Sequence, residues 1–317
     1  MAREALTVFF ATDIHGSGKC FRKFINSAAF FKADVLIMGG DITGKMVVPV
    51  IEEGGKFVAR FSGVRREVGR DKLEELEKQI SYMGYYPYRT TSDEVTRLQE
   101  HPEAVEELFH SLIVRTLEGW LQLAKERLSS TGVQVYISPG NDDTPLIDDV
   151  LRSDPFIVFP DNEVVCIRDW LPMVSCGTAN ITPFASHREL PEDDLYARIA
   201  ALAQKVSDPR RAIFNCHVPP KNTPLDQAPL LKEDLSPVVR AGEIVFGSVG
   251  SEAVRKAIET YQPLVGLHGH VHESRASCRI GKTTCFNPGS EYGEGVLRGV
   301  LLRLAPGKIV SHQLVVG

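Results

Sequence analysis

The sequence lacks several patterns that mark particular classes of protein. Its six cysteines have no C-x-x-C spacing, and several lie in apolar, strand-like runs where a thiol behaves as a small hydrophobic side chain. No stretch reaches the roughly 18 apolar residues of a membrane span, and the N-terminal apolar run continues into charged residues without a small-residue cleavage site. We therefore expect a cytoplasmic protein with reduced thiols and no membrane partner.

Two common catalytic motifs and a basic charge excess are also absent. The sequence contains neither the Walker loop G-x-x-x-x-G-K-[ST] nor the nucleophile elbow G-x-S-x-G. Its net charge is -5, with 36 lysines and arginines against 41 aspartates and glutamates, which gives no general attraction to nucleic acid. We do not expect a nucleic-acid partner, and nothing in the sequence indicates an oligomeric state.

The 317 residues suit one large domain, 1–317, that carries an insertion. Residues 1–45 have the pattern of a strand, a helix over about 19–32, and a second strand, and this alternation resumes near residue 131. The segment 45–131 instead begins with a hairpin in "KFVARFSGVRREV" and continues with the amphipathic helices "DKLEELEKQISYMG" and "HPEAVEELFHSLIVRTLEGWLQLAKERL". We expect this insertion to be mainly helical and cap-like, with its last helix, about 40 Å long, reaching over a neighbouring site.

The rest of the chain alternates predicted strands and helices. Strands are expected in "PFIVFP", "EVVCIRD", "LPMVSCGT", "RRAIFNCHVPP" and "LVGLHGHVHES", and helices over about 192–206 and in "SEAVRKAIETYQP". The tail is strand-rich. Because the first strands are apolar on both faces, the sheets should be covered on both sides, as in an α/β fold.

Five predicted strand ends carry residues that bind metals: Asp13 with His15, Asp41, Asn141, His217, and His270 with His272. Side chains at the carboxyl ends of strands in open α/β sheets collect at one site. Oxygen donors mixed with imidazoles suit Mn, Fe, Co, Ni or Zn, and the absence of cysteine argues against a structural zinc site. Seven donors are too many for one tetrahedral ion, but they suit two ions bridged by a carboxylate.

These fragments, in this order, resemble the calcineurin-like metallophosphoesterase superfamily. The resemblance rests on D-x-H at 13–15, G-D at 40–41, G-N-D at 140–142, the histidine of "NCHVPP", and G-H-V-H at 269–272. "GHVHES" and "GKTTCFNPGS" further resemble a branch of small prokaryotic phosphoesterases. The family's fold implies two packed mixed β-sheets flanked by helices, an αββα sandwich. The resemblance also implies that Asp13, His15 and His272 bind one metal, that Asn141, His217 and His270 bind the other, and that Asp41 bridges them.

The same resemblance implies a binuclear metal-dependent hydrolase of phosphate esters. Two dications, Mn²⁺ by preference and Fe, Zn, Ni or Co as alternatives, would lower the pKa of a bridging water, and the resulting hydroxide would attack the phosphate. We expect a small phosphodiester or nucleotide-like substrate, with Asp41, Asn141 and His268 as catalytic residues. The alternatives are a phosphomonoesterase or protein phosphatase, and a non-catalytic scaffold that binds partners through the insertion.

Asp142 departs from the family pattern, because many members carry at this position a histidine that protonates the leaving group. Two nearby dications would lower the pKa of an aspartate, which makes Asp142 a poor proton donor. His268, His187 or a metal-bound water are candidates for the role. If the strand persists through residue 272, His268 shares a face with His270 and His272, although a structural role is an equal alternative.

The insertion carries two segments with alternative interpretations. "SYMGYYPYRTTS", predicted as a loop between helices, holds four tyrosines and Arg89, which could stack on a base and pair with a phosphate. Packing of the tyrosines between insertion and main domain is favoured. The arginine-rich "RFSGVRREVGR" could be a solvated hairpin or a phosphate-facing flap. His101, His110 and His312 are expected to be solvated or packed.

Overall fold

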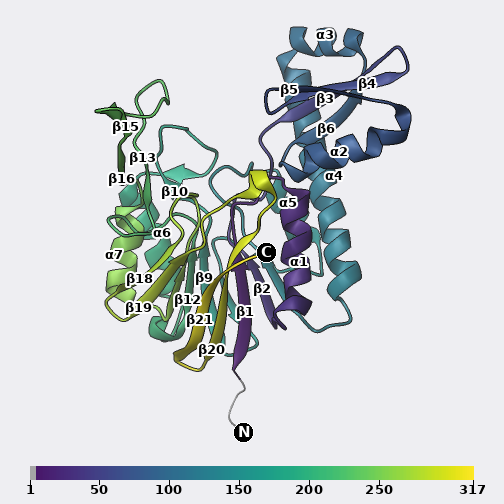
Figure 1. Ribbon diagram of the computed structural model, residues 1–317. Helices are drawn as coiled ribbons and strands as arrows, with labels where there is room; N and C mark the ends of the chain where they lie inside the picture. The colour runs from purple at the N-terminus through teal and green to yellow at the C-terminus, as the bar shows by residue number, and fades with distance from the viewer. Residues whose placement is uncertain (1–4) are drawn as a thin grey trace.

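The computed structural model describes residues 5–317, in which two β-sheets pack face to face between layers of helices (Figure 1). The first sheet has the strand order β21-β20-β1-β2-β7. Its strands are β1 Leu6–Ala11, β2 Val35–Met38, β7 Gln134–Ile137, β20 Arg298–Ala305 and β21 Lys308–Val316. β1, β2 and β7 are parallel, so their carboxyl ends lie at one edge of the sheet.

The second sheet has the order β18-β19-β17-β12-β9-β8. Its strands are β8 Val164–Ile167, β9 Leu171–Cys176, β12 Ile213–Cys216, β17 Val265–Leu267, β18 Ala276–Ile280 and β19 Thr283–Asn287. β9, β12, β17 and β19 run parallel, whereas β8 and β18 are antiparallel edge strands.

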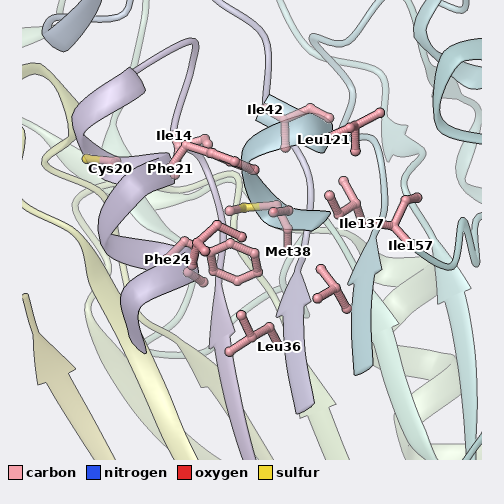
Figure 2. Close-up of a cluster of buried hydrophobic side chains, with 14 of the residues drawn as sticks. Ile14, Cys20, Phe21, Phe24, Leu36, Met38, Ile42, Leu121, Ile137 and Ile157 are labelled. Atoms are coloured by element: carbon pink, nitrogen blue, oxygen red, sulfur yellow. The ribbon is translucent and has the colours of Figure 1, made fainter. Parts of the chain in front are cut away.

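Alternation along the buried strands divides the core into layers. Val8 and Phe10 of β1 point into the core between the two sheets, whereas Phe9 and Ala11 point to the outer helices. The helices on that side are α1 Gly18–Phe30, α4 Pro102–Leu128 and α5 Ile147–Ser153, and Figure 2 shows part of the cluster that they bury. The other sheet is covered by α6 Glu192–Ala203 and α7 Glu252–Tyr261. The predicted αββα sandwich is confirmed.

The inserted segment contains a sheet of its own, with the order β5-β4-β3-β6. The predicted hairpin forms β4 Lys56–Phe61 and β5 Val64–Val68, and the predicted helices form α2 Leu73–Tyr82 and α4, joined by α3 Ser92–Glu100. The expected tyrosine-rich loop is wrong, because its centre is strand β6, Tyr86–Thr90, which pairs in parallel with β3, Val47–Glu53. Aromatic residues favour such a strand, and buried Val48 and Val50 of β3 give the sheet its own small core.

Three glycines close the base of the insertion. A Cβ on Gly16 would lie 2.6 Å from Cα of Gly44, one on Gly44 would lie 2.2 Å from the Gly84 carbonyl oxygen, and one on Gly84 would lie 2.2 Å from the His15 carbonyl oxygen. We call these residues the glycine junction. Because only glycine permits such close approach, the chain at Gly44, where the insertion begins, and at Gly84, after α2, packs backbone to backbone against the loop after β1. In Figure 1 the insertion rises from the same end of the sandwich as the carboxyl ends of β1 and β2.

One predicted strand does not form. Residues of "PFIVFP" make only an isolated parallel bridge between Val158 and Tyr136, because Pro155 and Pro160 limit the pairing at this edge of the sheet.

A second segment extends from the sandwich at residues 227–248, and we call it the outer hairpin. It contains β13 Gln227–Pro229, β14 Val239–Arg240, β15 Glu243–Ile244 and β16 Phe246–Ser248. β10 Ala179–Asn180 and β11 Glu189–Leu190 form a further short pair. Among the described helices, none is long and apolar enough to cross a membrane.

Candidate metal centre

The seven predicted ligands come from the loops that follow β1, β2, β7, β12 and β17. In parallel sheets these loops open at the same edge, and here the two sheets bring their edges together. The structure therefore places all seven side chains in one cluster, although they are spread over 260 positions from Asp13 to His272 in numbering, about four fifths of the chain. Their roles as ligands stay predictions, which the geometry below supports.

One group of ligand atoms consists of Asp13, His15 and His272, which lie within 4.8 Å of one another. Nε2 of His272 lies 3.4 Å from a carboxylate oxygen of Asp13 and 3.1 Å from Nε2 of His15. This spacing matches neighbouring ligands around a single ion, since ligands at about 2.1 Å from a metal are about 3 Å apart.

The second group contains Asp41, His217 and His270, again within 4.8 Å of one another. Nε2 of His217 lies 3.4 Å from Oδ2 of Asp41, and Oδ1 of Asn141 lies 2.7 Å from Nδ1 of His270. The same Oδ2 of Asp41 is 3.7 Å from Nε2 of His15 in the first group. Asp41 therefore lies between the groups, where a bridging carboxylate would be needed.

The chemistry of this cluster fits divalent cations. His217 is buried, its Nδ1 is 3.0 Å from the Gly39 carbonyl oxygen, and its Nε2 has no hydrogen-bond partner among the described residues. Burial would lower the pKa of His217, but the neighbouring Asp41 raises it to about 10, because a positive charge is favoured here. For Asp13 the effects have the opposite sign. Burial would raise the pKa of this carboxyl, but the hydrogen bond to His272 and the charge of His217 lower it to about 2. Two buried carboxylates thus lie where a bound cation would stabilise them.

The loops hold four of these residues in the left-handed region of backbone conformation. The φ angles are 54° at Asp13, 38° at His15, 49° at Asp41 and 66° at His270. Such conformations cost about 1–3 kcal/mol each in non-glycine residues, and they persist where surrounding contacts fix them. Clustering of this strain at the candidate ligands indicates that the loops are built to orient these side chains.

Asp143 is a residue of the site that the sequence analysis did not identify. Its buried carboxylate accepts hydrogen bonds from the backbone amides of Gly140, Ile42 and Thr43 and from the Thr43 hydroxyl, at 2.6–3.1 Å. Burial, followed by the charge of Asp41, raises the pKa of Asp143 to about 6. Asp143 therefore ties the loop that carries Asn141 to the loop that carries Asp41. Its position in "GNDD" beside a candidate ligand was the only sequence signal.

His268 differs from the sequence expectation. β17 ends at Leu267, and the left-handed φ at His270 breaks the alternation, so the shared face predicted for the three histidines does not exist. His268 is fully buried, and its Nδ1 lies 2.8 Å from the Cys216 carbonyl oxygen. Its Nε2 lies close to Gly266, where a Cβ would be 2.7 Å away. Burial lowers the pKa of His268 to about 4. These contacts favour a structural role, and the catalytic role stays a prediction without geometric support.

Asp142 is held by three side chains at the mouth of the site, one of which is Asn141, whose Nδ2 donates to the Asp142 carboxylate at 3.2 Å. Its carboxylate accepts a hydrogen bond of 2.7 Å from the Ser186 hydroxyl and forms a close ion pair with Lys45, whose side chain is 53% exposed. Burial would lower the pKa of Lys45, but Asp142 raises it, so the ammonium charge is favoured. The neighbour of Ser186, His187, is exposed and does not belong to the ligand groups formed by the described residues. Lys45 is thus a cation beside the site that sequence reasoning did not identify.

Tyr292 forms another part of the site that the sequence did not indicate. Its ring centroid lies 4.8 Å from that of His15 and 5.9 Å from that of His272.

The tyrosines of the insertion mostly have structural partners instead: the Tyr86 hydroxyl accepts from the Gly44 amide, and Tyr88 donates to Glu94. Arg89 pairs with Glu77. These contacts favour the packing interpretation of the tyrosine-rich segment.

Comparisons with known proteins support the fold more than the function. No model of a protein family matches the sequence. An uncharacterized protein of Methanocaldococcus jannaschii is 32% identical over 158 residues, which are 49% of this chain and 64% of that protein, so the match spans less than two thirds of the relative.

Comparison with solved structures likewise supports the fold and not the function. One crystal structure is similar over 99% of this chain and 98% of its own, with a TM-score of 0.56 and 17% identity, which supports the fold alone. The structure of a novel archaeal phosphodiesterase matches over 98% of this chain and 100% of its own, with a TM-score of 0.38 and 11% identity, values that carry no functional argument. The chain is therefore a mixed α/β protein with candidate metal-binding groups at the carboxyl ends of its strands.

Proposed function

We propose that this protein is a binuclear metal-dependent phosphoesterase of the calcineurin-like type, acting on a small phosphodiester or nucleotide-like substrate. The observation that carries the proposal is the meeting of seven predicted ligands in two adjacent groups, with Asp41 between them. A structural role for all seven would leave buried carboxylates and imidazoles without a cation, which is energetically costly. Strained backbone at four of the seven supports a functional role over a structural one.

The ligand groups would each hold one divalent cation, Mn²⁺ by preference. The first cation would be held by Asp13, His15 and His272, the second by Asn141, His217 and His270, and Asp41 would contact both. Bound there, such cations supply Lewis-acid stabilisation of phosphate oxygens and an activated water nucleophile.

The chain's own residues would position the phosphate and balance its charge. The Gly39 carbonyl fixes the ring of His217, so that Nε2 points at the ligand group. Lys45 stands at the mouth with a favoured positive charge, and Asp142, itself bound by Ser186, holds it there. A lysine ammonium binds phosphate oxygens as a compact point charge. Lys45 would therefore contact the phosphate and stabilise charge on the departing oxygen, so that Asp142 acts by orienting Lys45 and not by donating a proton.

The test is a metal-supplemented screen of phosphomonoesters against phosphodiesters, with metal content measured on the same samples. The proposal expects close to two Mn²⁺ per chain after reconstitution and turnover of a phosphodiester that requires the metal. Less than one metal per chain would instead support the alternative of a non-catalytic scaffold. Turnover of phosphomonoesters alone would support the phosphomonoesterase alternative.

A further inference from the structure

A pocket beside the candidate metal centre has an unusually apolar lining. It has a volume of 550 Å³, and His270 and His272 form part of its wall. Its apolar lining comes from the loop after β10 and from the outer hairpin: Ile181, Pro183, Phe184, Leu230 and Leu231. Pockets of about 300–1,000 Å³ hold ligands the size of typical cofactors and drugs. We call this space the apolar pocket.

Its apolar side chains are exposed to a degree that packing does not explain. Ile181 is 64% exposed, Phe184 is 60% exposed and Leu230 is 36% exposed. Single exposed apolar residues are ordinary, but several that gather around one concavity mark a binding surface.

The loop after β10, which presents Ile181 and Phe184, is held by several internal hydrogen bonds. The carboxylate of Glu189 accepts hydrogen bonds from the Thr182 hydroxyl at 2.6 Å, from the Thr182 amide at 3.0 Å and from the Ser186 amide at 3.1 Å. The Thr182 hydroxyl in turn accepts from the Phe184 amide at 3.2 Å. Phe184 is therefore held outward by a hydrogen-bonded loop, and its exposure is a built feature of the fold.

Two charged side chains of the pocket wall, Glu192 and Lys221, are already paired with protein groups, and a third, Glu273, is exposed beside His272. Glu192 accepts from the Ser251 hydroxyl and from the amides of Glu252 and Ala253, at the start of α7. Lys221 pairs with Glu252 at 2.7 Å. The surface left for a ligand is consequently mostly apolar side chain, and His270 and His272 join this surface to the candidate metal centre.

We propose that the apolar pocket binds an aliphatic or aromatic alcohol group of the phosphate-ester substrate while its phosphate lies at the metal centre. This proposal rests on the proposed function and narrows its substrate class towards apolar esters and away from nucleotides. A larger cavity of 1010 Å³ lies between α2, α4 and β6, but none of the seven candidate ligands is among its described lining residues. The apolar pocket is therefore the space that can hold a substituent of a phosphate bound at the centre.

The experiment measures binding of methyl-, butyl- and octylphosphonate to the Mn²⁺-loaded protein by calorimetry. These probes share a head group and differ in chain length, so the dependence of Kd on length measures how much of the alkyl chain the apolar pocket buries. We expect Kd to fall about three- to fourfold per methylene that becomes buried, with a heat-capacity change that becomes more negative with length. Phe184→Ala and Leu230→Ala should weaken the dependence of Kd on chain length, while the Kd of methylphosphonate stays within about twofold of the wild-type value.

Phe246→Ala is the matched control, because Phe246 is 54% exposed on the outer hairpin but is not among the residues that line the pocket. It should keep the wild-type dependence on chain length. A Kd independent of length in the wild type, or equal losses in Phe184→Ala and Phe246→Ala, would overturn the proposal. Tighter binding of thymidine 5′-monophosphate than of octylphosphonate, lost in Phe184→Ala, would also overturn it, in favour of a nucleobase.

Binding and turnover separate the two proposals. Should the protein hydrolyse no phosphate ester while Kd still falls with chain length, the proposed function fails and the pocket assignment stands. Hydrolysis of a phosphate ester with no effect of chain length on Kd would support the proposed function and overturn the pocket assignment.

Discussion

Oδ2 of Asp41 lies 3.4 Å from Nε2 of His217 and 3.7 Å from Nε2 of His15, two histidines that belong to different ligand groups. One carboxylate therefore faces both candidate metal positions. The first prediction follows from this position.

Asp41→Asn should lower kcat/KM for a phosphodiester by at least about 100-fold, because an amide removes the negative charge shared by both ions. Metal content, measured on the purified protein after Mn²⁺ reconstitution, should fall below that of the wild type. Asp169→Asn is the control, since Asp169 is an exposed carboxylate outside the ligand groups. Full activity in Asp41→Asn would refute the two-metal mechanism.

Lys45→Gln should lower kcat by about 10- to 100-fold while bound metal stays at the wild-type level, because the change removes a charge that faces the phosphate but no metal ligand. Steady-state kinetics and metal analysis together test this. Lys56→Gln serves as control, because Lys56 is an exposed lysine of the insertion paired with Glu67. An unchanged kcat in Lys45→Gln would remove Lys45 from the mechanism.

Asp143→Ala should reduce the free energy of unfolding by about 3 kcal/mol or more, because it leaves several buried donors of the loops at 42–43 and 140 without an acceptor. Urea denaturation monitored by circular dichroism gives the value. Asp149→Ala is a suitable comparison, since this aspartate lies on the exposed face of α5. Equal stability of both variants would show that Asp143 does not join the two loops.

Gly84→Ala should destabilise the protein far more than Gly63→Ala. Both glycines have positive φ angles, +87° and +73°, so both substitutions carry backbone strain of about 1–2 kcal/mol. Only at Gly84 would the new Cβ also meet the His15 carbonyl oxygen, because the space around Gly63 is open. Thermal unfolding of the pair measures the difference, and Gly84→Ala should bind Mn²⁺ more weakly as well. Equal shifts in Tm would mean that the junction tolerates a side chain.

Removal of metal should lower stability. Treatment with EDTA is expected to decrease the free energy of unfolding by about 3 kcal/mol relative to protein with metal at a hundredfold excess over Kd. The loss should be reversed by Mn²⁺ and should be smaller in Asp41→Asn. A wild-type Tm that does not respond to EDTA or Mn²⁺ would contradict the assignment of these residues as ligands.

The sequence patterns predicted the covered strands and the convergence of the ligands for a physical reason, whereas the αββα sandwich was implied by the family resemblance. Apolar runs that end in Asp13, Asp41 or His217 report both a buried strand and the chemistry at its carboxyl end. β6 was missed because tyrosines, Pro87 and Arg89 give no apolar alternation, and its pairing with β3 is a tertiary contact. The contacts of Asp142 were equally hidden, because Lys45 and Ser186 approach it from loops far apart in sequence.

His268 shows the limit of periodicity as a guide. Alternate positions share a face only while the backbone stays extended, and here the strand ends one residue earlier. The left-handed φ at His270 then turns the chain, so the ring of His268 faces the protein interior while His270 and His272 face the ligand groups.

Under the proposed function, the glycine junction would fix one wall of the path by which a substrate reaches the candidate metal centre. Since Gly44 and Gly84 approach the loop of His15 and Gly16 through backbone atoms, the wall on that side is fixed to a loop that carries a candidate ligand. The opposite wall consists of the loop at 181–189, which is bonded to the loop of Asn141 and Asp142, and of the outer hairpin, which is bonded to Ser274 through Gln227. Under the proposed function, the phosphate would therefore lie between two walls that are each bonded to the loops of the candidate ligands.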